Sequence, residues 1–389
     1  MLGHLSVDMN QGALPASLPF LIAARGMNYT SATALVFGSN IAASIIQPVS
    51  GYLGDKSARY WFMSLGLVLA GSGFAMVGLL ENYWAIFIVV IVSGIGNAVF
   101  HPEGGRLSNL VSDNNKGASM SIFAVGGSLA FVIGPLILTL AMTNFGIRGT
   151  SVFFIPAIVI AAIFMIMTKG LLKAADNNAA NTGESAVGPA DAAGRQNGES
   201  IGPPIKDDWK AFFKLAIFIF FRAMVLFGMV TFIPLYWVGI LSQSQAAGSS
   251  ALAVYSVASV FSTLLGGFLA DRYGFNKIIN ISSVTFIPFL VLFTLIPDLR
   301  LSYFLLIPMG FAIQLSFSTI ISLGQSFIPN HVGFASGITM GTAVSVGGIV
   351  APILGRVSDL YGLGTTFYVL IVLSIIAAVA GFLVPKHKR

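Results

Sequence analysis

The chain has 389 residues, of which 56% are hydrophobic and only 9% are charged, and its mean hydropathy is +0.88. Soluble domains carry about 25% charged residues, so this composition excludes a water-soluble enzyme. Cysteine is absent, which excludes a disulfide framework, a thiolate metal site and a cysteine nucleophile. A membrane-spanning helix needs about 20 apolar residues, so the length leaves room for about a dozen spans. The composition therefore predicts a polytopic protein whose main partner is the lipid bilayer.

Apolar runs between turn and charge signals predict an all-α membrane protein with 12 transmembrane helices. The expected helices are 3–24, 31–54, 60–80, 84–107, 117–142, 150–172, 210–239, 248–270, 278–297, 301–327, 334–355 and 364–385. The first run lacks a basic n-region and a small-residue cleavage site, so we expect a retained helix rather than a signal peptide.

The basic residues are distributed unevenly between the two sides of these spans. With a cytoplasmic N-terminus, 15 of the 20 Lys and Arg residues fall on the cytoplasmic side, 4 fall outside and Arg222 remains within a span. Cytoplasmic loops of membrane proteins carry such an excess, so both termini are predicted to be cytoplasmic. Because this orientation accounts for the positive net charge, we expect no nucleic-acid partner.

The segment 174–207 contains three prolines, is rich in Ala, Asn and Gly, and has no aromatic residue. It therefore predicts a flexible cytoplasmic linker between a six-helix half at 1–173 and a second half at 208–389. The halves repeat one another: the pattern Gly51 to Lys56 returns at Gly267 to Arg272, at an offset of 216 residues. Parallel six-helix repeats are typical of alternating-access transporters.

The residues of this repeat also carry a family resemblance. Residues 51–59 read Gly-Tyr-Leu-Gly-Asp-Lys-Ser-Ala-Arg and resemble the loop signature of the major facilitator superfamily. The run from Gly126 to Pro135 is similar to the glycine–proline pattern of its antiporters. Residues 3–15 and 97–106 resemble the fosmidomycin-resistance-type exporters of that superfamily. The resemblance implies two pseudo-symmetric halves, alternating access and a place in the bacterial inner (cytoplasmic) membrane.

Few ionisable residues lie within the predicted spans. A charge at the bilayer centre costs at least about 2.5–3.5 kcal/mol, so each of these residues is expected to face a partner or a cavity. On the first helix, His4, Asp8 and Gln11 share one face. On the fourth helix, Pro102 removes a backbone hydrogen bond and frees a carbonyl that a cavity can use. The other polar residues of that helix are Asn97, His101, Glu103 and Arg106.

These two helices suggest a proton-binding group, since both place their polar residues in the cytoplasmic half of the span. We hypothesise that Asp8, His101 and Glu103 couple transport to protons and that Arg106 tunes them. Asp8 is expected to meet His101 or Arg106, and Glu103 can pair with Arg106 at the i, i+3 spacing. The alternative is a purely structural polar network or an interfacial ion pair.

Arg222 is the basic residue left inside a predicted span of the second half, without an acid of that half nearby. Three interpretations stay open: it binds an anionic substrate group, it pairs with an acid of the first half, or it reaches the membrane interface. The expected substrate-binding residues are Arg222, His4, Gln11, Asn97 and Gln314.

The remaining predicted site residues concern conformational change. The expected latch consists of Gly51, Asp55, Lys56 and Arg59 with Asp271 and Arg272 of the second copy, in which Phe275 replaces the final arginine. The expected hinges in helices 5 and 11 are Gly126, Gly127, Gly134, Pro135, Gly347, Gly348 and Pro352. The latch role is implied by the superfamily resemblance.

The function predicted from these patterns is proton-coupled export of a drug or a small metabolite, including an anionic one, by a monomer. No phosphate-binding loop, metal-ligand motif or nucleophile elbow occurs, so we expect neither cofactor nor metal nor enzymatic activity. The alternatives are a proton-coupled importer, a uniporter, a sensor or scaffold that transports nothing, and a membrane-embedded enzyme.

Replacing Asp55 by Asn should lower transport turnover without changing substrate preference, because the latch stabilises one conformation and contacts no substrate. Transport rates for a panel of substrates, normalised to the amount of protein, would check this. A changed order of substrate preference in Asp55→Asn would contradict the predicted latch.

Overall fold

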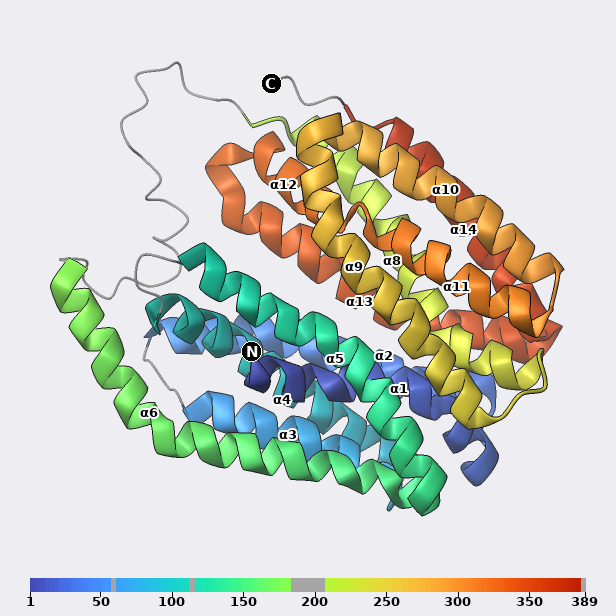
Figure 1. The fold of residues 1–389 in the computed structure, drawn as a ribbon, viewed down its shortest axis with the longest axis horizontal. Coiled ribbons are helices and arrows are strands. Elements are labelled where there is room, and N and C mark those ends of the chain that lie inside the picture. The colour runs from blue at the N-terminus through green and yellow to red at the C-terminus, as the bar shows by residue number, and fades with distance from the viewer. Residues whose placement is uncertain (57–60, 112–115, 183–206, 386–389) are drawn as a thin grey trace. The chain divides into compact units, whose positions relative to one another are not determined.

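The computed structural model describes residues 1–56, 61–111, 116–182 and 207–385, and all regular structure in these ranges is helical (Figure 1). The all-α prediction is therefore confirmed for the described residues. The count of 12 spans and the cytoplasmic position of both termini stay predictions.

The helices follow the expected order along the chain. Those before the linker are α1 (Leu2–Arg25), α2 (Tyr29–Lys56), α3 (Trp61–Met76), α4 (Tyr83–Val111), α5 (Lys116–Phe145), the 3-10 helix η1 (Gly146–Phe153) and α6 (Phe154–Thr182). Those after it are α8 (Trp209–Gly239), α9 (Gln245–Tyr273), α10 (Phe275–Leu295), α11 (Leu299–Gln314), α12 (Phe317–Phe327), η2 (Pro329–His331), α13 (Val332–Tyr361) and α14 (Leu363–Phe382).

Two helices differ from the sequence prediction. The single helix expected at 301–327 is interrupted, because α11 ends at Gln314 and α12 begins at Phe317. The helix expected at 150–172 begins at Phe154, after η1, and continues to Thr182, beyond the predicted start of the linker. Residues 183–206 of the predicted linker 174–207 lie outside the described residues.

The chain forms two compact units that do not coincide with a single cut in the sequence. Unit 1 consists of residues 1–17 and 38–199, and unit 2 consists of residues 18–37 and 200–389. Within unit 1, α3 packs against α4 and α6, and within unit 2, α8 packs against α13 and α14 (Figure 1). Helices α1 and α2 are each shared, since one end of each belongs to unit 1 and the other to unit 2.

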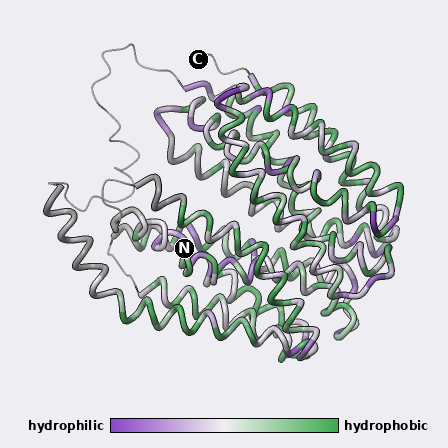
Figure 2. The backbone as a smooth tube through the Cα atoms, viewed as in Figure 1, coloured by the Kyte–Doolittle hydropathy of each residue, from purple (hydrophilic) through white to green (hydrophobic). Residues whose placement is uncertain are grey.

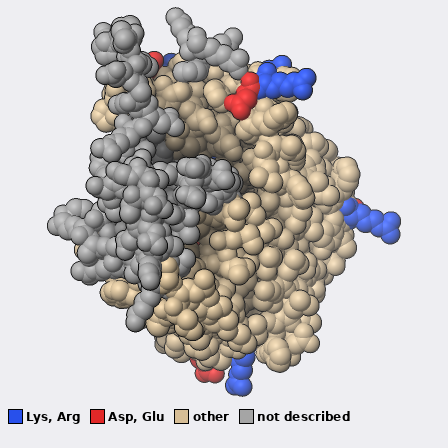
Figure 3. Space-filling model, turned by 60° about the vertical axis from the view of Figure 1, so that its left-hand side comes forward, with Lys and Arg blue, Asp and Glu red and all other residues tan. Residues whose placement is uncertain are grey.

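Apolar side chains cover the helices along most of their length. Figure 2 shows hydrophobic residues over the helix bodies and hydrophilic residues mainly near the helix ends. Among the described residues on the face drawn in Figure 3, the Lys, Arg, Asp and Glu that can be seen lie near its edges. Eight segments of the described chain are long and apolar enough to cross a membrane, as expected for a multi-pass membrane protein.

Candidate functional site

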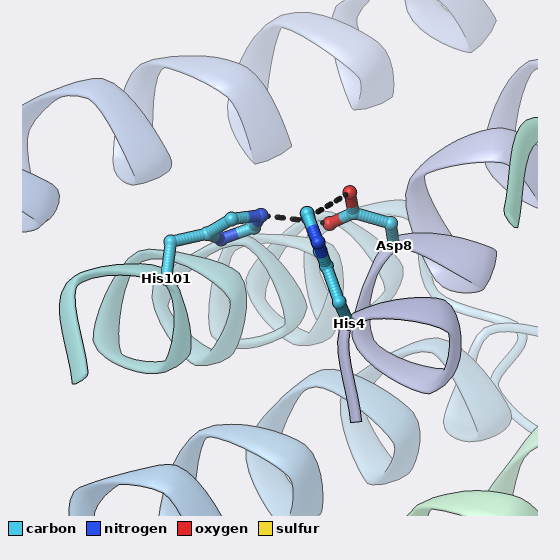
Figure 4. Close-up of side chains that lie close together, drawn as sticks. All are labelled: His4, Asp8 and His101. Atoms are coloured by element: carbon cyan, nitrogen blue, oxygen red, sulfur yellow. Dashed lines mark ion pairs between the residues drawn. The ribbon is translucent and has the colours of Figure 1, made fainter. Parts of the chain in front are cut away.

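The polar residues of the first and fourth helices meet inside unit 1. His4 and Asp8 lie one turn apart on α1, and His4 Nε2 is 3.0 Å from Asp8 Oδ2. His101 reaches the same carboxylate from α4, with its Nε2 atom 3.0 Å from Asp8 Oδ1. Figure 4 shows both imidazole rings directed at the one carboxylate. Because Asp8 is only 6% exposed, the structure buries a carboxylate between two histidines.

Hydrogen bonds on the opposite side of each ring determine where the protons lie. His4 Nδ1 is 2.7 Å from the carbonyl oxygen of Phe123, and His101 Nδ1 is 2.6 Å from that of Asn97. A carbonyl oxygen only accepts, so each Nδ1 carries a hydrogen and donates it. Each Nε2 then faces a carboxylate oxygen, and a hydrogen must lie between them for the contact to be attractive. The cluster therefore needs a proton at both contacts, and losing one leaves two lone pairs facing each other.

Helix α5 closes the cluster from the side. The Phe123 ring stacks on the His4 ring with the centroids 4.1 Å apart. Close to it, Gly127 lies against the same α1 residues: a Cβ there would be 2.6 Å from His4 Nε2 and 3.0 Å from Asp8 Oδ2. Only glycine therefore allows α5 to approach the histidine–carboxylate pair this closely.

Pro102 interrupts the backbone hydrogen bonding of α4 beside His101. A proline has no N–H, so the carbonyl of Ala98 lacks its helical donor. Ser50 of α2 supplies the missing donor, with its Oγ atom 2.7 Å from that carbonyl oxygen. The freed carbonyl is thus bound by a neighbouring helix, whereas we had expected it to be available to a cavity.

The other predicted residues of α1 and α4 lie around this cluster. The Asn97 side chain is buried, and neither polar atom of its amide has a hydrogen-bond partner among the described residues. Its substrate-binding role stays a prediction. Glu103 is buried in α4, and Gln11 on α1 is half-buried. The Arg106 side chain lies outside the described residues, so its pair with Glu103 stays a prediction.

The three side chains of the cluster also lie close enough together to hold a metal ion. The ligand atoms of His4, Asp8 and His101 all lie within 4.8 Å of one another. Each Nε2 atom, however, already faces an oxygen of Asp8 at hydrogen-bond distance. A proton is sufficient to hold each of these contacts, and the expected absence of a metal site stays a prediction.

Arg222, on α8, supports the interruption between α11 and α12. Its Nε and Nη2 atoms donate to the carbonyl oxygen of Ile313 at 3.1 and 2.6 Å. Nη2 also donates to Gln314 Oε1 at 2.6 Å, and Nε donates to Ser316 Oγ at 3.1 Å. The last carbonyls of a helix lack backbone donors, and in a membrane the protein must supply them. Arg222 is therefore a side-chain cap for the end of α11.

Three serines extend this cap along the same helix end. Ser282 of α10 donates to the carbonyl oxygen of Ala312 at 2.6 Å. Ser262 and Ser259 of α9 donate to the carbonyl oxygens of Phe311 and Gly310. Together with Arg222, side chains from three helices therefore bind four consecutive carbonyls of α11. We call Arg222, Ser259, Ser262 and Ser282 the α11 collar.

The predicted latch and hinge residues are described only in part. The surroundings of Gly51, the side chains of Asp55 and Lys56, and the whole of Arg59 lie outside the described residues. Asp271 and Arg272 are exposed at the end of α9, and the Arg272 guanidinium lies 5.5 Å from the Tyr273 ring centroid. Of the hinge glycines, Gly126 and Gly134 approach the α1 backbone and Gly347 approaches the Phe227 ring. Their hinge role stays a prediction.

A further histidine–carboxylate pair lies before α8, outside the apolar helices. His331 Nδ1 is 2.9 Å from Asp207 Oδ2, and the backbone N–H of Asn330 donates to Asp207 Oδ1 at 3.1 Å. Desolvation opposes the ionisation of this carboxyl, but the hydrogen bonds from Asn330 and His331 outweigh it and hold the pKa of Asp207 below its ordinary value. The pair connects the residues before α8 to η2 and is separate from the buried cluster.

Long apolar helices in two units, with a buried ionisable cluster, define a membrane transporter. The chain belongs to the Major Facilitator Superfamily, whose sequence profile matches residues 1–352. It is therefore a transporter and not an enzyme.

Known proteins resemble the chain over almost its whole length. The MFS-type transporter YfnC of Bacillus subtilis is 26% identical over 99% of this chain and 91% of its own. The fosmidomycin resistance protein of Escherichia coli is 26% identical over 92% of this chain and 85% of its own. The structure of a bacterial homolog of the human lysosomal transporter Spinster aligns with a TM-score of 0.78 at 13% identity, over 98% of this chain and 94% of the other. This last similarity concerns the fold alone.

Replacing Gly127 by Ala should impair transport, because the new methyl group displaces His4 from Asp8. Transport assays with Gly127→Ala in proteoliposomes, at wild-type protein amounts, would check this. Gly105→Ala on α4 is the matched control, since a Cβ there meets no atom of the described residues within 4 Å. Equal activity of both variants would show that the close approach of α5 is dispensable.

Replacing Arg222 by Met should destabilise the protein by about 1–2 kcal/mol, because the carbonyl of Ile313 loses its side-chain donors. Thermal unfolding in detergent would measure this, and Ser282→Ala should cause a smaller loss of the same kind. An Arg222→Met protein as stable as the wild type would show that the arginine does not support the end of α11.

Proposed function

We propose that the chain is a proton-coupled secondary active exporter of a drug or of a small anionic metabolite in the bacterial inner membrane. The proposal of proton coupling rests on the buried cluster of His4, Asp8 and His101. In this proposal the two six-helix halves alternate access to a central site, the segment 174–207 links them, and both termini lie in the cytoplasm.

The number of protons in the cluster controls how three helices are held together. When both contacts carry a proton, His4 and His101 bind Asp8 from α1 and α4, and α5 anchors the His4 ring. When the proton between His101 and Asp8 leaves, that contact becomes repulsive and the attraction between α4 and α1 weakens. Proton release is thereby linked to helix packing, and such linkage is what an antiporter needs to exchange protons for substrate.

The geometry suggests a division of roles. His4, predicted to bind substrate, joins the proton-coupling group in this proposal because of its contact with Asp8. Glu103 is the second buried acid of that group, and Arg106 tunes it. Asn97 and Gln11 remain proposed substrate contacts, since Asn97 has two unpartnered amide atoms in the same turn of α4 as His101.

An anionic substrate group can use only part of Arg222. Its Nε and Nη2 atoms are occupied by the end of α11, and Gln314 is bound to the same guanidinium. The Nη1 atom is therefore the donor that we propose for the substrate. Two other interpretations of Arg222 were an ion pair with an acid of the first half and a position at the membrane interface. Neither explains why Arg222 binds the end of α11.

The export direction rests on relatives. One relative is named as a fosmidomycin resistance protein, and export of the drug is one way to give resistance. Fosmidomycin is a phosphonate, so the same name also fits an anionic substrate. A proton-coupled importer would use the same cluster in the opposite direction. A uniporter, a sensor or a scaffold has no need of a buried carboxylate between two histidines, so the cluster argues against these alternatives.

Replacing Asp8 by Asn should abolish proton-driven transport while leaving exchange of substrate for substrate measurable. The amide removes the charge that the histidines hold but keeps the shape of the side chain. Purified protein in liposomes, with and without an imposed pH gradient, would be tested with fosmidomycin and with a hydrophobic cation. Glu103→Gln should show the same loss.

Glu81→Gln is the matched control, because it removes an exposed carboxylate of the same half. Gradient-driven accumulation that persists in both Asp8→Asn and Glu103→Gln would refute the proposed coupling. A preference for the cation over the phosphonate would count against Arg222 as an anion-binding residue.

A further inference from the structure

The end of α13 repeats the sequence pattern found at the end of α9. Residues 267–274 and 355–362 both have Gly at the first position, Asp at the fifth, Tyr at the seventh and Gly at the eighth. The geometry matches too: Gly274 and Gly362 have φ angles of 95° and 88°, and each donates its N–H to the carbonyl four residues earlier. The α9 copy is the second copy of the predicted cytoplasmic latch. The α13 copy falls at the opposite, outer side in the predicted topology.

The aspartate of the α13 copy binds the beginning of another helix. Asp359 Oδ1 accepts a hydrogen bond from the backbone N–H of Tyr29 at 2.9 Å, and Oδ2 accepts one from that of Thr30 at 2.8 Å. The Thr30 hydroxyl also donates to Oδ2. The first N–H groups of a helix have no backbone acceptor, and the helix dipole favours a negative charge there. Asp359 therefore caps α2 from a position 330 residues away in the sequence.

The glycine that opens the α13 copy makes this contact sterically feasible. A Cβ at Gly355 would lie 2.3 Å from Thr33 Oγ1 and 2.8 Å from the carbonyl oxygen of Tyr29. Any larger residue would push the start of α2 away from α13 and draw its N–H groups out of reach of Asp359. The glycine and the aspartate of the motif thus serve the same contact.

The capped end of α2 belongs to a different unit from the rest of that helix. Residues 18–37 pack with α13 in unit 2, whereas α2 from Gly38 onward packs in unit 1. A movement of one unit relative to the other must therefore either bend α2 or release its first turn from α13. Three hydrogen bonds to one carboxylate stabilise the docked first turn against this release.

We propose that Asp359 and Gly355 form an outer latch, which must open when substrate is released on the outer side. It has the pattern of the cytoplasmic latch but lies on the opposite side of the membrane. This inference rests on the proposed alternating-access function. While Asp359 caps α2, the outer ends of α1 and α2 stay docked on the second half. Loss of the cap favours the state in which they separate.

The native chain has no cysteine, so a single introduced cysteine can report on this opening. Thr33 is fully buried and its side chain faces Gly355, which makes Thr33→Cys the reporter. In that background, Asp359→Asn should speed labelling by a membrane-impermeant maleimide from the outside about threefold to tenfold. Thr30→Val, which removes only the hydroxyl donor, should give a smaller increase in the same direction.

Asp298→Asn is the matched control, because Asp298 caps its own helix through the N–H of Leu301 at 2.8 Å and its carboxylate bonds to no distant element among the described residues. Unchanged labelling of Asp359→Asn, in protein with the elution profile and melting temperature of the parent, would overturn the latch. So would an equal increase in Asp298→Asn. Labelling requires no substrate, so a failure of the proposed transport function is distinguishable from a failure of the latch.

Discussion

A polar group inside an apolar helix bundle must find its hydrogen-bond partner within the protein, because lipid offers none. This constraint accounts for the main contacts between helices here. The carboxylate of Asp8 is held by histidines of α1 and α4, the carbonyl of Ile313 is held by Arg222 of α8, and the first N–H groups of α2 are held by Asp359 of α13. Each polar group is satisfied by a residue on a different helix or turn, so satisfying it also fixes how helices pack.

Polar contacts of about 3 Å require close backbones, and glycine provides them. Gly127 lies where α5 meets the pair His4–Asp8, and Gly355 lies where α13 meets the start of α2. In both places a methyl group would enter the space of the polar atoms themselves. The glycines of this chain therefore contribute to its chemistry by letting helices approach at the sites where charge is held, as well as to apolar packing between helices.

The three polar contacts differ in what is needed to break them. The α11 collar joins four carbonyls to side chains of three helices, so opening it would break several hydrogen bonds at once. The histidine cluster is held by protons and weakens when one leaves. The cap on α2 depends on one carboxylate and lies within unit 2, although α2 itself continues into unit 1. A static support, a proton-dependent contact and a cap held by one carboxylate fit the coupled transport that we propose.

Periodicity and composition act within one helix, and they were sufficient to predict the helix order and the shared face of His4 and Asp8. They could not reveal the interruption of the helix expected at 301–327, because the residues at the break, Leu315 and Ser316, include neither Gly nor Pro. The partners of Arg222 and Asp359 were also hidden, since they lie about 90 and 330 residues away. The sequence by itself determined which residues carry charge into the bundle. Only the tertiary structure decided what each charge binds, because that depends on how neighbouring helices are rotated and how closely they approach.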